Sequence, residues 1–299
     1  MEVLLTGATG FVGSSVLPAL LAGGHAVTAL VRSDVSADTV TAAGATSLRG
    51  DLRDRDVLIQ AARSADAVIH LGSPGDETSG AVDDAVASAF LTGLEGSGKP
   101  YIHTSGAWVH GNTRGLIDER AGFDPPPIVA WRLPIEARIR AAASDGVRSV
   151  ILCLGLVYGH GHGLPRLLVD GPRTDGPEPA LLFPGTGEQH WTTVHVDDLG
   201  PLYTAALTGA AAGSSYHGVS GQNPTVRELA EAASRAAGLG GRVAPEAVEA
   251  TRARLGLLEG ALALDQQATG TRARTELGWQ PTGPSLLQDF ETGSYAPHS

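Results

Sequence analysis

The sequence is poor in several residues on which particular kinds of protein depend. Among its 299 residues there is one cysteine, Cys153, which excludes an internal disulfide and a cysteine-cluster metal site. There is also one lysine, Lys99, so the remaining basic residues are all arginines. The formal net charge of −11 disfavours non-specific binding to nucleic acid. No apolar run is long enough to cross a bilayer, and no signal peptide opens the chain. We therefore expect a cytoplasmic protein that binds neither nucleic acid nor membranes.

The first half of the chain alternates strand patterns with helix patterns. Strands are expected at 1–5, 26–31, 46–48, 67–71, 100–104 and 147–154, and helices at 14–22, 35–43, 55–64, 82–93 and 135–143. Strands that alternate with helices form a parallel sheet covered on both faces. The pattern therefore predicts an α/β fold with a Rossmann-like doubly wound parallel sheet.

The second half is less regular. Residues 159–187 are rich in glycine and proline, which favours loops beside a pocket. A strand is expected at 192–196, and helices at 198–207, 225–237, 245–255 and 285–293. We predict a dinucleotide-binding part, 1–158, completed by about 190–217. A smaller C-terminal substrate-binding region would comprise 159–189 and 218–299.

A glycine-rich turn stands between the first expected strand and the first helix. Gly7, Gly10 and Gly13 follow the pattern G-x-x-G-x-x-G. Such a turn allows positive φ, a close approach of the backbone to a pyrophosphate, and tight packing of the helix. The helix N-terminus then presents free N–H groups to the phosphates. This context predicts a dinucleotide site.

The end of the second strand bears on the choice of cofactor. An NAD site usually has an acidic residue here, which accepts from the ribose 2′-hydroxyl. This chain has Arg32 followed by Ser33, and an arginine matches a 2′-phosphate through a charge-assisted fork. With Asp34 in the acidic role, the site would instead suit NAD(H). We favour NADP(H).

Further motifs accompany these features along nearly the whole chain. They are TGATGFVG at 6–13, RGDL at 49–52, AVIHLGS at 67–73, HTSG at 103–106, LGLVYG at 154–159, HVDDL at 195–199 and LGW at 277–279. With them the chain resembles the extended short-chain dehydrogenase/reductase superfamily, in the group of NAD-dependent epimerases and dehydratases. The resemblance implies the strand order 3-2-1-4-5-6-7 and a homodimer formed through helices of the Rossmann-like part.

The resemblance also implies roles for individual residues in holding the cofactor. Asp51 and Leu52 would flank the adenine, although Asp51 could instead cap the next helix. Leu71, Gly72 and Ser73 would run past the adenosine ribose and phosphates, Thr104 would lie near the nicotinamide ribose, and Leu156 near the carboxamide. The remaining candidates belong to the glycine-rich turn: Gly7, Thr9, Gly10, Phe11, Val12 and Gly13.

The catalytic motif that the resemblance implies is not retained. Its tyrosine and lysine stand four residues apart on one helix face. None of the five tyrosines here has a lysine four residues later. In the register we favour, Trp131 takes the tyrosine position and Ile135 the lysine position. The family serine falls on Gly106, with Ser105 one residue early. An indole cannot act as an acid near neutral pH, so an alkoxide product would lack its usual proton donor.

Other side chains are candidates to replace the missing groups. Ser105, His110 and Trp131 are the catalytic candidates, and Arg132 could stabilise an oxyanion. Trp108, Tyr158, His160 and Trp191 are candidates for substrate contact. The spacing of the histidines at 160, 162, 190 and 195 fits no zinc pattern, so no metal site is expected.

Three functions fit these observations. The first is an atypical NADP(H)-dependent oxidoreductase acting on a small aromatic or conjugated molecule. The second is an isomerase, cyclase or lyase that uses the same pocket without net redox chemistry. The third is a non-catalytic NADP(H)-binding sensor or scaffold. The sequence does not identify the substrate.

Overall fold

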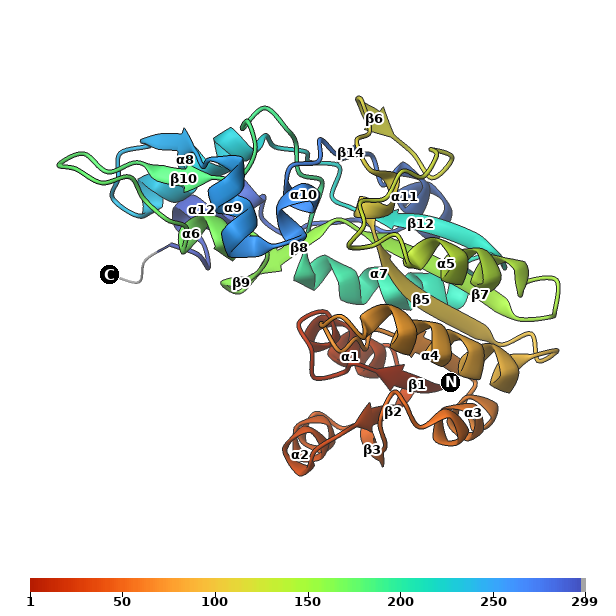
Figure 1. Ribbon diagram of the computed structural model, residues 1–299. Coiled ribbons are helices and arrows are strands. Elements are labelled where there is room, and N and C mark those ends of the chain that lie inside the picture. The colour runs from red at the N-terminus through yellow and green to blue at the C-terminus, as the bar shows by residue number, and fades with distance from the viewer. Residues whose placement is uncertain (297–299) are drawn as a thin grey trace.

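A seven-stranded parallel sheet lies at the centre of the computed structural model, which describes residues 1–296 (Figure 1). Its strands are, from one edge to the other, β12 (Ser214–Gly218), β7 (Arg148–Leu154), β5 (Pro100–Gly106), β4 (Ala67–His70), β1 (Glu2–Thr6), β2 (Ala26–Val31) and β3 (Thr46–Arg49). Numbered among themselves, the strands have the order 3-2-1-4-5-6-7. Both the Rossmann-like sheet and the implied strand order are confirmed.

Helices cover both faces of the sheet because successive strand residues point to opposite sides. In β1, Val3 and Leu5 enter one buried cluster, and Leu4 enters the other. The first cluster packs under α1 (Gly13–Ala22), α2 (Asp34–Ala42), α7 (Val196–Gly209) and α11 (Thr271–Leu277). The second packs under α3 (Arg55–Ser64), α4 (Ser79–Leu94) and α5 (Arg132–Ala141). The continuous apolar runs of the strands follow from this double coverage.

A third apolar core lies beyond β8 (Leu156–Gly159), at the far end from β3 in Figure 1. It is built from β8, α6 (Arg166–Val169), β10 (Leu181–Phe183), α8 (Val226–Ala236), α10 (Leu258–Leu262) and α12 (Leu286–Thr292). Smaller elements complete this region and its junction with the sheet: β9 (His162–Gly163), β11 (Thr193–His195), β13 (Val243–Pro245), α9 (Val248–Leu255), the 3-10 turn η1 (Ala107–His110), β6 (Leu116–Ile117) and β14 (Gln267–Ala268). Within residues 1–296, no helix combines the length and apolar character needed to cross a bilayer.

Some element boundaries differ from the sequence predictions. Helix α5 begins at Arg132 and not at residue 135, because Pro134 lies in its first turn, where a backbone N–H needs no partner. The segment 159–187 forms β9, α6 and β10 in addition to loops. Strand β12 was not predicted as a separate strand, because its sequence SSYHG lacks an apolar pattern. It forms by pairing with β7.

Candidate active site

The glycine-rich turn brings β1, α1 and the loop after β4 into close contact. Gly7 has φ +72°, and a Cβ there would lie 2.8 Å from the backbone nitrogen of Gly72. A Cβ on Gly13 would lie 2.1 Å from the carbonyl oxygen of Gly7. Neither position can hold a side chain without moving backbone. The sequence needs glycine here to close the turn against its neighbours.

A cavity of about 210 Å³ opens beside this turn, and we call it the glycine-turn cavity. Its lining is Thr6, Gly7, Thr9, Gly10, Leu30, Val31, Arg32, Ser36, Leu52, Leu71, Gly72 and Ser73. Eight of the residues predicted to bind the cofactor are therefore brought together here. Within residues 1–296, the backbone N–H groups of Phe11 and Val12 donate to no protein acceptor. Free N–H groups at the start of a helix suit the negative charge of a pyrophosphate.

The acidic and basic residues after β2 are oriented differently. Arg32 is exposed, lines the glycine-turn cavity and forms no ion pair within residues 1–296. Asp34 instead faces Arg49, with 3.5 Å between its Oδ1 and the guanidinium Nη2. The Ser33 hydroxyl accepts from the Ser36 N–H at 3.1 Å and caps α2. Of these two serines, Ser36 lines the cavity and Ser33 does not.

The other predicted cofactor residues lie outside this cavity. Asp51 accepts from the Arg53 N–H at 2.9 Å, and the capping position of α3 belongs to Asp54. The Thr104 hydroxyl donates to the His70 carbonyl at 2.8 Å and contacts the Tyr203 hydroxyl at 2.6 Å. Val12 precedes α1, and Phe11 and Leu156 line a neighbouring cavity.

That neighbouring cavity, which we call the Ser105 cavity, measures about 330 Å³. Its lining is Phe11, Ser105, Gly106, Ala107, Trp108, Val129, Arg132, Leu154, Gly155, Leu156, Val157, Gly163, Leu164 and Gln266. Phe11 follows Gly10 directly in the chain, so consecutive residues of the glycine-rich turn line the two cavities. Arg132 is the only charged side chain among the lining residues that the structure describes.

Hydrogen bonds hold the polar groups of the Ser105 cavity in place. Ser105 Oγ donates to Glu136 Oε1 at 2.5 Å, and Arg140 Nη1 donates to the other carboxylate oxygen at 3.3 Å. Arg132 Nη1 donates to the Thr104 carbonyl at 3.2 Å. The Arg132 guanidinium also lies over the Trp131 ring, 4.4 Å from its centroid. The cavity is thus lined by the positively charged Arg132, held in place by its contacts, and by the Ser105 hydroxyl, which already donates its hydrogen bond to Glu136.

Residues 7–160 match the model of a family described as NAD(P)H-binding. The chain belongs to this NAD(P)H-binding family. An uncharacterized protein of Schizosaccharomyces pombe is 32% identical to this NAD(P)H-binding protein, over 99% of this chain and all of its own length. A 3-diazoavenalumate denitrifying reductase from a Streptomyces species is 28% identical, over 95% of this chain and 97% of its own.

Solved structures support the fold of the NAD(P)H-binding protein. The Thermus thermophilus UDP-glucose 4-epimerase in complex with NAD superposes with a TM-score of 0.75. The match covers 99% of this chain and 98% of the epimerase, at 22% identity. This likeness shows a shared fold, and the Streptomyces relative is named as an enzyme.

Neither Trp131 nor Ile135 lines the Ser105 cavity. The Trp131 indole N–H donates to the Ile128 carbonyl at 3.0 Å, and its ring packs against Gly80. Ile135 is buried in the core beneath α4 and α5. The two α5 residues that reach the Ser105 region are Arg132 and Glu136, which have the same four-residue spacing. The four-residue spacing could have identified Arg132 and Glu136 if the motif had been aligned one residue further along the chain than Trp131 and Ile135.

The other predicted contact residues are scattered. Trp108 lines the Ser105 cavity, but the Tyr158 hydroxyl donates to the Pro284 carbonyl at 2.6 Å and the ring is buried. Exposed His160 faces Asp197, with 2.9 Å between Nε2 and Oδ1. Trp191 is buried and donates to the Leu262 carbonyl at 3.0 Å. Gln266 enters the cavity from the C-terminal region, and no motif marked it.

A buried polar chain supports the glycine-turn cavity from behind. Thr6 Oγ1 contacts His70 Nδ1 at 2.7 Å, and His70 Nε2 contacts Asp83 Oδ1 at 3.0 Å. His103 Nε2 lies 3.5 Å from the second Asp83 oxygen, and its Nδ1 contacts the Tyr101 hydroxyl at 3.0 Å. Burial lowers the pKa of His103 to about 3, outweighing the attraction of Asp83. His103 is therefore neutral in the folded protein near neutral pH.

This imidazole makes stability depend on pH. The unfolded chain takes up a proton at His103 below its ordinary pKa of 6.5, whereas the folded protein does so only near pH 3. Neutral His103 therefore makes its whole contribution to the free energy of unfolding above pH 6.5, and this contribution is lost as the pH falls towards 3. In urea unfolding, His103→Gln should reduce the slope of unfolding free energy against pH below 6.5 by about 1.4 kcal/mol per pH unit. His160→Gln, at an exposed site, is the control. An unchanged slope in His103→Gln would contradict the assignment.

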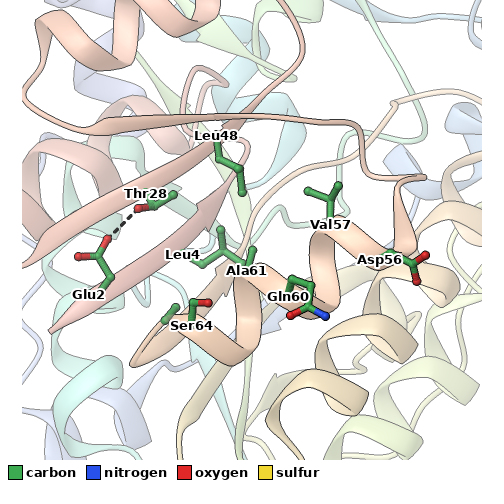
Figure 2. A pocket seen from close by; sticks show the side chains of 10 residues that line it. Glu2, Leu4, Thr28, Leu48, Asp56, Val57, Gln60, Ala61 and Ser64 are labelled. Carbon is green, nitrogen blue, oxygen red and sulfur yellow. Dashed lines mark hydrogen bonds between the residues drawn. The ribbon is translucent and has the colours of Figure 1, made fainter.

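A further cavity lies elsewhere, over β1, β2 and β3 beside α3, and measures about 570 Å³ (Figure 2). Figure 2 shows Leu4, Leu48, Val57 and Ala61 along its wall, with Thr28 donating to Glu2 at 2.7 Å at one end. It contains no residue of the glycine-rich turn. It is therefore separate from the cofactor site.

Proposed function

We propose that this NAD(P)H-binding protein is an NADP(H)-dependent oxidoreductase that reduces a small conjugated or aromatic electrophile. A reduced nicotinamide supplies a hydride to such a substrate. The observation that carries the proposal is the pair of cavities lined by consecutive residues of the glycine-rich turn. One presents an unpaired arginine at the ribose position. The other has a cation but no side chain that could act as a general acid near neutral pH.

The cofactor fits the residues present. Gly7 and Gly13 leave no room for a Cβ, so the turn brings backbone close to the cavity. Free N–H groups at the start of α1 would hold the pyrophosphate. Arg32 would bind the 2′-phosphate through charge-assisted hydrogen bonds, because Asp34 is occupied by Arg49.

The Ser105 cavity suits a reaction in which no alkoxide must be protonated. Iminium ions, quinones and conjugated carbonyls accept hydride at carbon and leave either a neutral product or a delocalised anion. Arg132 would stabilise that anion, and Trp108 offers an apolar face to a planar substrate. The Streptomyces relative is named as a reductase acting on a diazo compound, which is an electrophile of this kind.

The test begins with fluorescence titration of NADPH and NADH, followed by stopped-flow oxidation of NADPH with a panel of iminium, quinone, conjugated carbonyl and diazo compounds. Stoichiometric oxidation with at least one class is expected. If NADPH binds but no class is reduced, the reductase proposal fails. Turnover of a substrate without loss of NADPH would indicate an isomerase or lyase instead.

Replacing Arg32 tests the choice of cofactor. Arg32→Ala should weaken NADPH binding about 10- to 100-fold, because a hydrogen bond between charged groups contributes about 1.5–3 kcal/mol. The affinity for NADH should change little, since it lacks the 2′-phosphate. Arg63→Ala, in the last turn of α3, is the matched control. Equal weakening of both cofactors would show that Arg32 does not select NADPH.

A further inference from the structure

Three side chains with soft metal-binding atoms meet at the carboxyl end of the sheet. They are His110 from η1, Cys153 from β7 and His217 from β12. Each is buried, and their ligand atoms all lie within 4.8 Å of one another. Their wide separation along the chain gave the sequence no metal-binding signature. This group is distinct from the histidines at 160, 162, 190 and 195.

The two imidazoles face each other through the atoms that would bind a metal. His110 Nε2 and His217 Nε2 are 3.0 Å apart. His110 Nδ1 lies 2.9 Å from the Gly122 carbonyl, which must accept, so this nitrogen carries the proton and Nε2 presents a lone pair. A carbonyl that fixes the far nitrogen in this way is typical of metal-binding histidines. Since His110 Nε2 can only accept, His217 Nε2 donates to it, and His217 Nδ1 is the unprotonated nitrogen, buried without a partner within residues 1–296. Binding of a metal at His217 Nε2 would therefore require this proton to move to Nδ1.

The third group and its surroundings complete a zinc-like donor set. Burial raises the pKa of the Cys153 thiol, and a bound cation would oppose this by stabilising the thiolate. Cys153, His110 and His217 line a cavity of about 280 Å³ that also contains Glu119 and Glu136, which we call the His110 cavity. Glu119 is held beside His217, whose backbone N–H donates to its Oε1 at 2.8 Å.

We propose that His110, Cys153 and His217 form a binding site for a divalent transition-metal ion of the zinc type, with a fourth position open to the His110 cavity. Two imidazoles and one thiolate select zinc-like ions over magnesium or calcium, which prefer oxygen ligands. In a tetrahedral zinc site the ligand atoms lie about 3.4–3.6 Å apart. The two Nε2 atoms are 3.0 Å apart and the ligand atoms of all three side chains lie within 4.8 Å of one another, so side-chain rotations would be needed to reach that spacing.

The proposed metal site would stabilise the part of the Ser105 cavity that contains Ser105 itself. Cys153 is the register partner of Ser105 in the pairing of β5 with β7. Glu136 accepts from Ser105 and also lines the His110 cavity. A bound ion would cross-link η1, β7 and β12 and thereby hold this part of the cavity rigid. The proposal stands independently of the identity of the cofactor or substrate.

A second group of metal-binding atoms provides an internal comparison. His70, Asp83 and His103 also have ligand atoms within 4.8 Å of one another. His70 Nε2 and Asp83 Oδ1 contact each other at 3.0 Å, whereas Asp83 Oδ2 and His103 Nε2 are buried without a hydrogen-bond partner within residues 1–296. Variants in the two groups can therefore tell which of them binds a metal.

The experiment titrates the chelator-treated full-length protein with Co²⁺ and follows thiolate-to-cobalt charge-transfer absorption in the near ultraviolet. One ion per chain is expected, together with a rise in Tm when Zn²⁺ is added. Cys153→Ser is nearly isosteric and should abolish the absorption band. It should also weaken Zn²⁺ binding by more than about 100-fold, because losing a group that only orients a ligand already costs about 10–100-fold. His217→Asn should do the same, with circular dichroism and the metal-free Tm as checks on folding.

The controls are Asp83→Asn and His25→Gln, which should both keep the band and the Tm shift. The proposal is overturned if the wild-type protein binds no Co²⁺, or if Cys153→Ser retains the band. It is also overturned if Asp83→Asn, and not the Cys153 variant, loses the metal.

Discussion

Replacing Arg132 with alanine should lower kcat about 100- to 1000-fold, the effect of removing one preorganised charge-stabilising group from an active site. Arg132 is the only charged side chain lining the Ser105 cavity in the described part of the chain. It is already positioned by the Thr104 carbonyl and by stacking on Trp131, so it need not reorganise during the reaction. Steady-state kinetics with the substrate found in the panel gives the measurement.

Two further variants sharpen this prediction. Arg132→Lys should recover part of kcat, because it keeps the charge but loses the planar fork. Arg138→Ala removes an arginine from the same helix, where it pairs with Asp84 at 2.7 Å, and should leave kcat unchanged. A fully active Arg132→Ala enzyme would show that the cavity stabilises its product without this cation.

Replacing Gly13 with alanine should lower the free energy of unfolding by about 3 kcal/mol, near the upper end for an overpacked site. The added Cβ would lie 2.1 Å from the Gly7 carbonyl oxygen and 2.6 Å from that of Ala8. Both obstacles are backbone atoms, so α1 would have to move away from the turn. For a chain of this length we expect Tm to fall by roughly 6–12 °C in thermal unfolding.

Gly10→Ala is the matched comparison. Its Cβ would meet only the Gly7 carbonyl oxygen, at 3.3 Å, and Gly10 lines the glycine-turn cavity. The variant should therefore fold with a Tm within about 2 °C of the wild type, but bind NADPH more weakly. Equal Tm losses in the two variants would mean that the turn does not depend on the close packing of Gly13.

The elements that the sequence predicts well share a simple physical cause. Strands such as β1 and β7 are buried on both faces, so each contains an unbroken run of apolar residues that is visible without tertiary information. The glycine-rich turn is visible because only glycine tolerates the positive φ of Gly7 and the tight contact at Gly13. Strand β12 is not visible in this way, because its polar sequence becomes a strand only by pairing with β7.

Which side chains of α5 face the Ser105 cavity depends on how the helix is rotated about its axis, and the sequence does not show that rotation. A shift of one residue turns a helix by about 100°, so assigning Trp131 and Ile135 or Arg132 and Glu136 to the cavity changes its chemistry completely. The start of α5 near Pro134 and the packing of Ile135 into the core determine which pair faces Ser105.

By itself, the sequence determined the Rossmann-like sheet, the glycine-rich turn, the arginine after β2 and the absence of any tyrosine followed four residues later by lysine, because each can be read from residues close together in the chain. The tertiary structure alone decided that Gln266 reaches the Ser105 cavity and that His110, Cys153 and His217 converge. Such contacts arise when distant segments pack against the same edge of a sheet, and no local pattern records which of their side chains will meet.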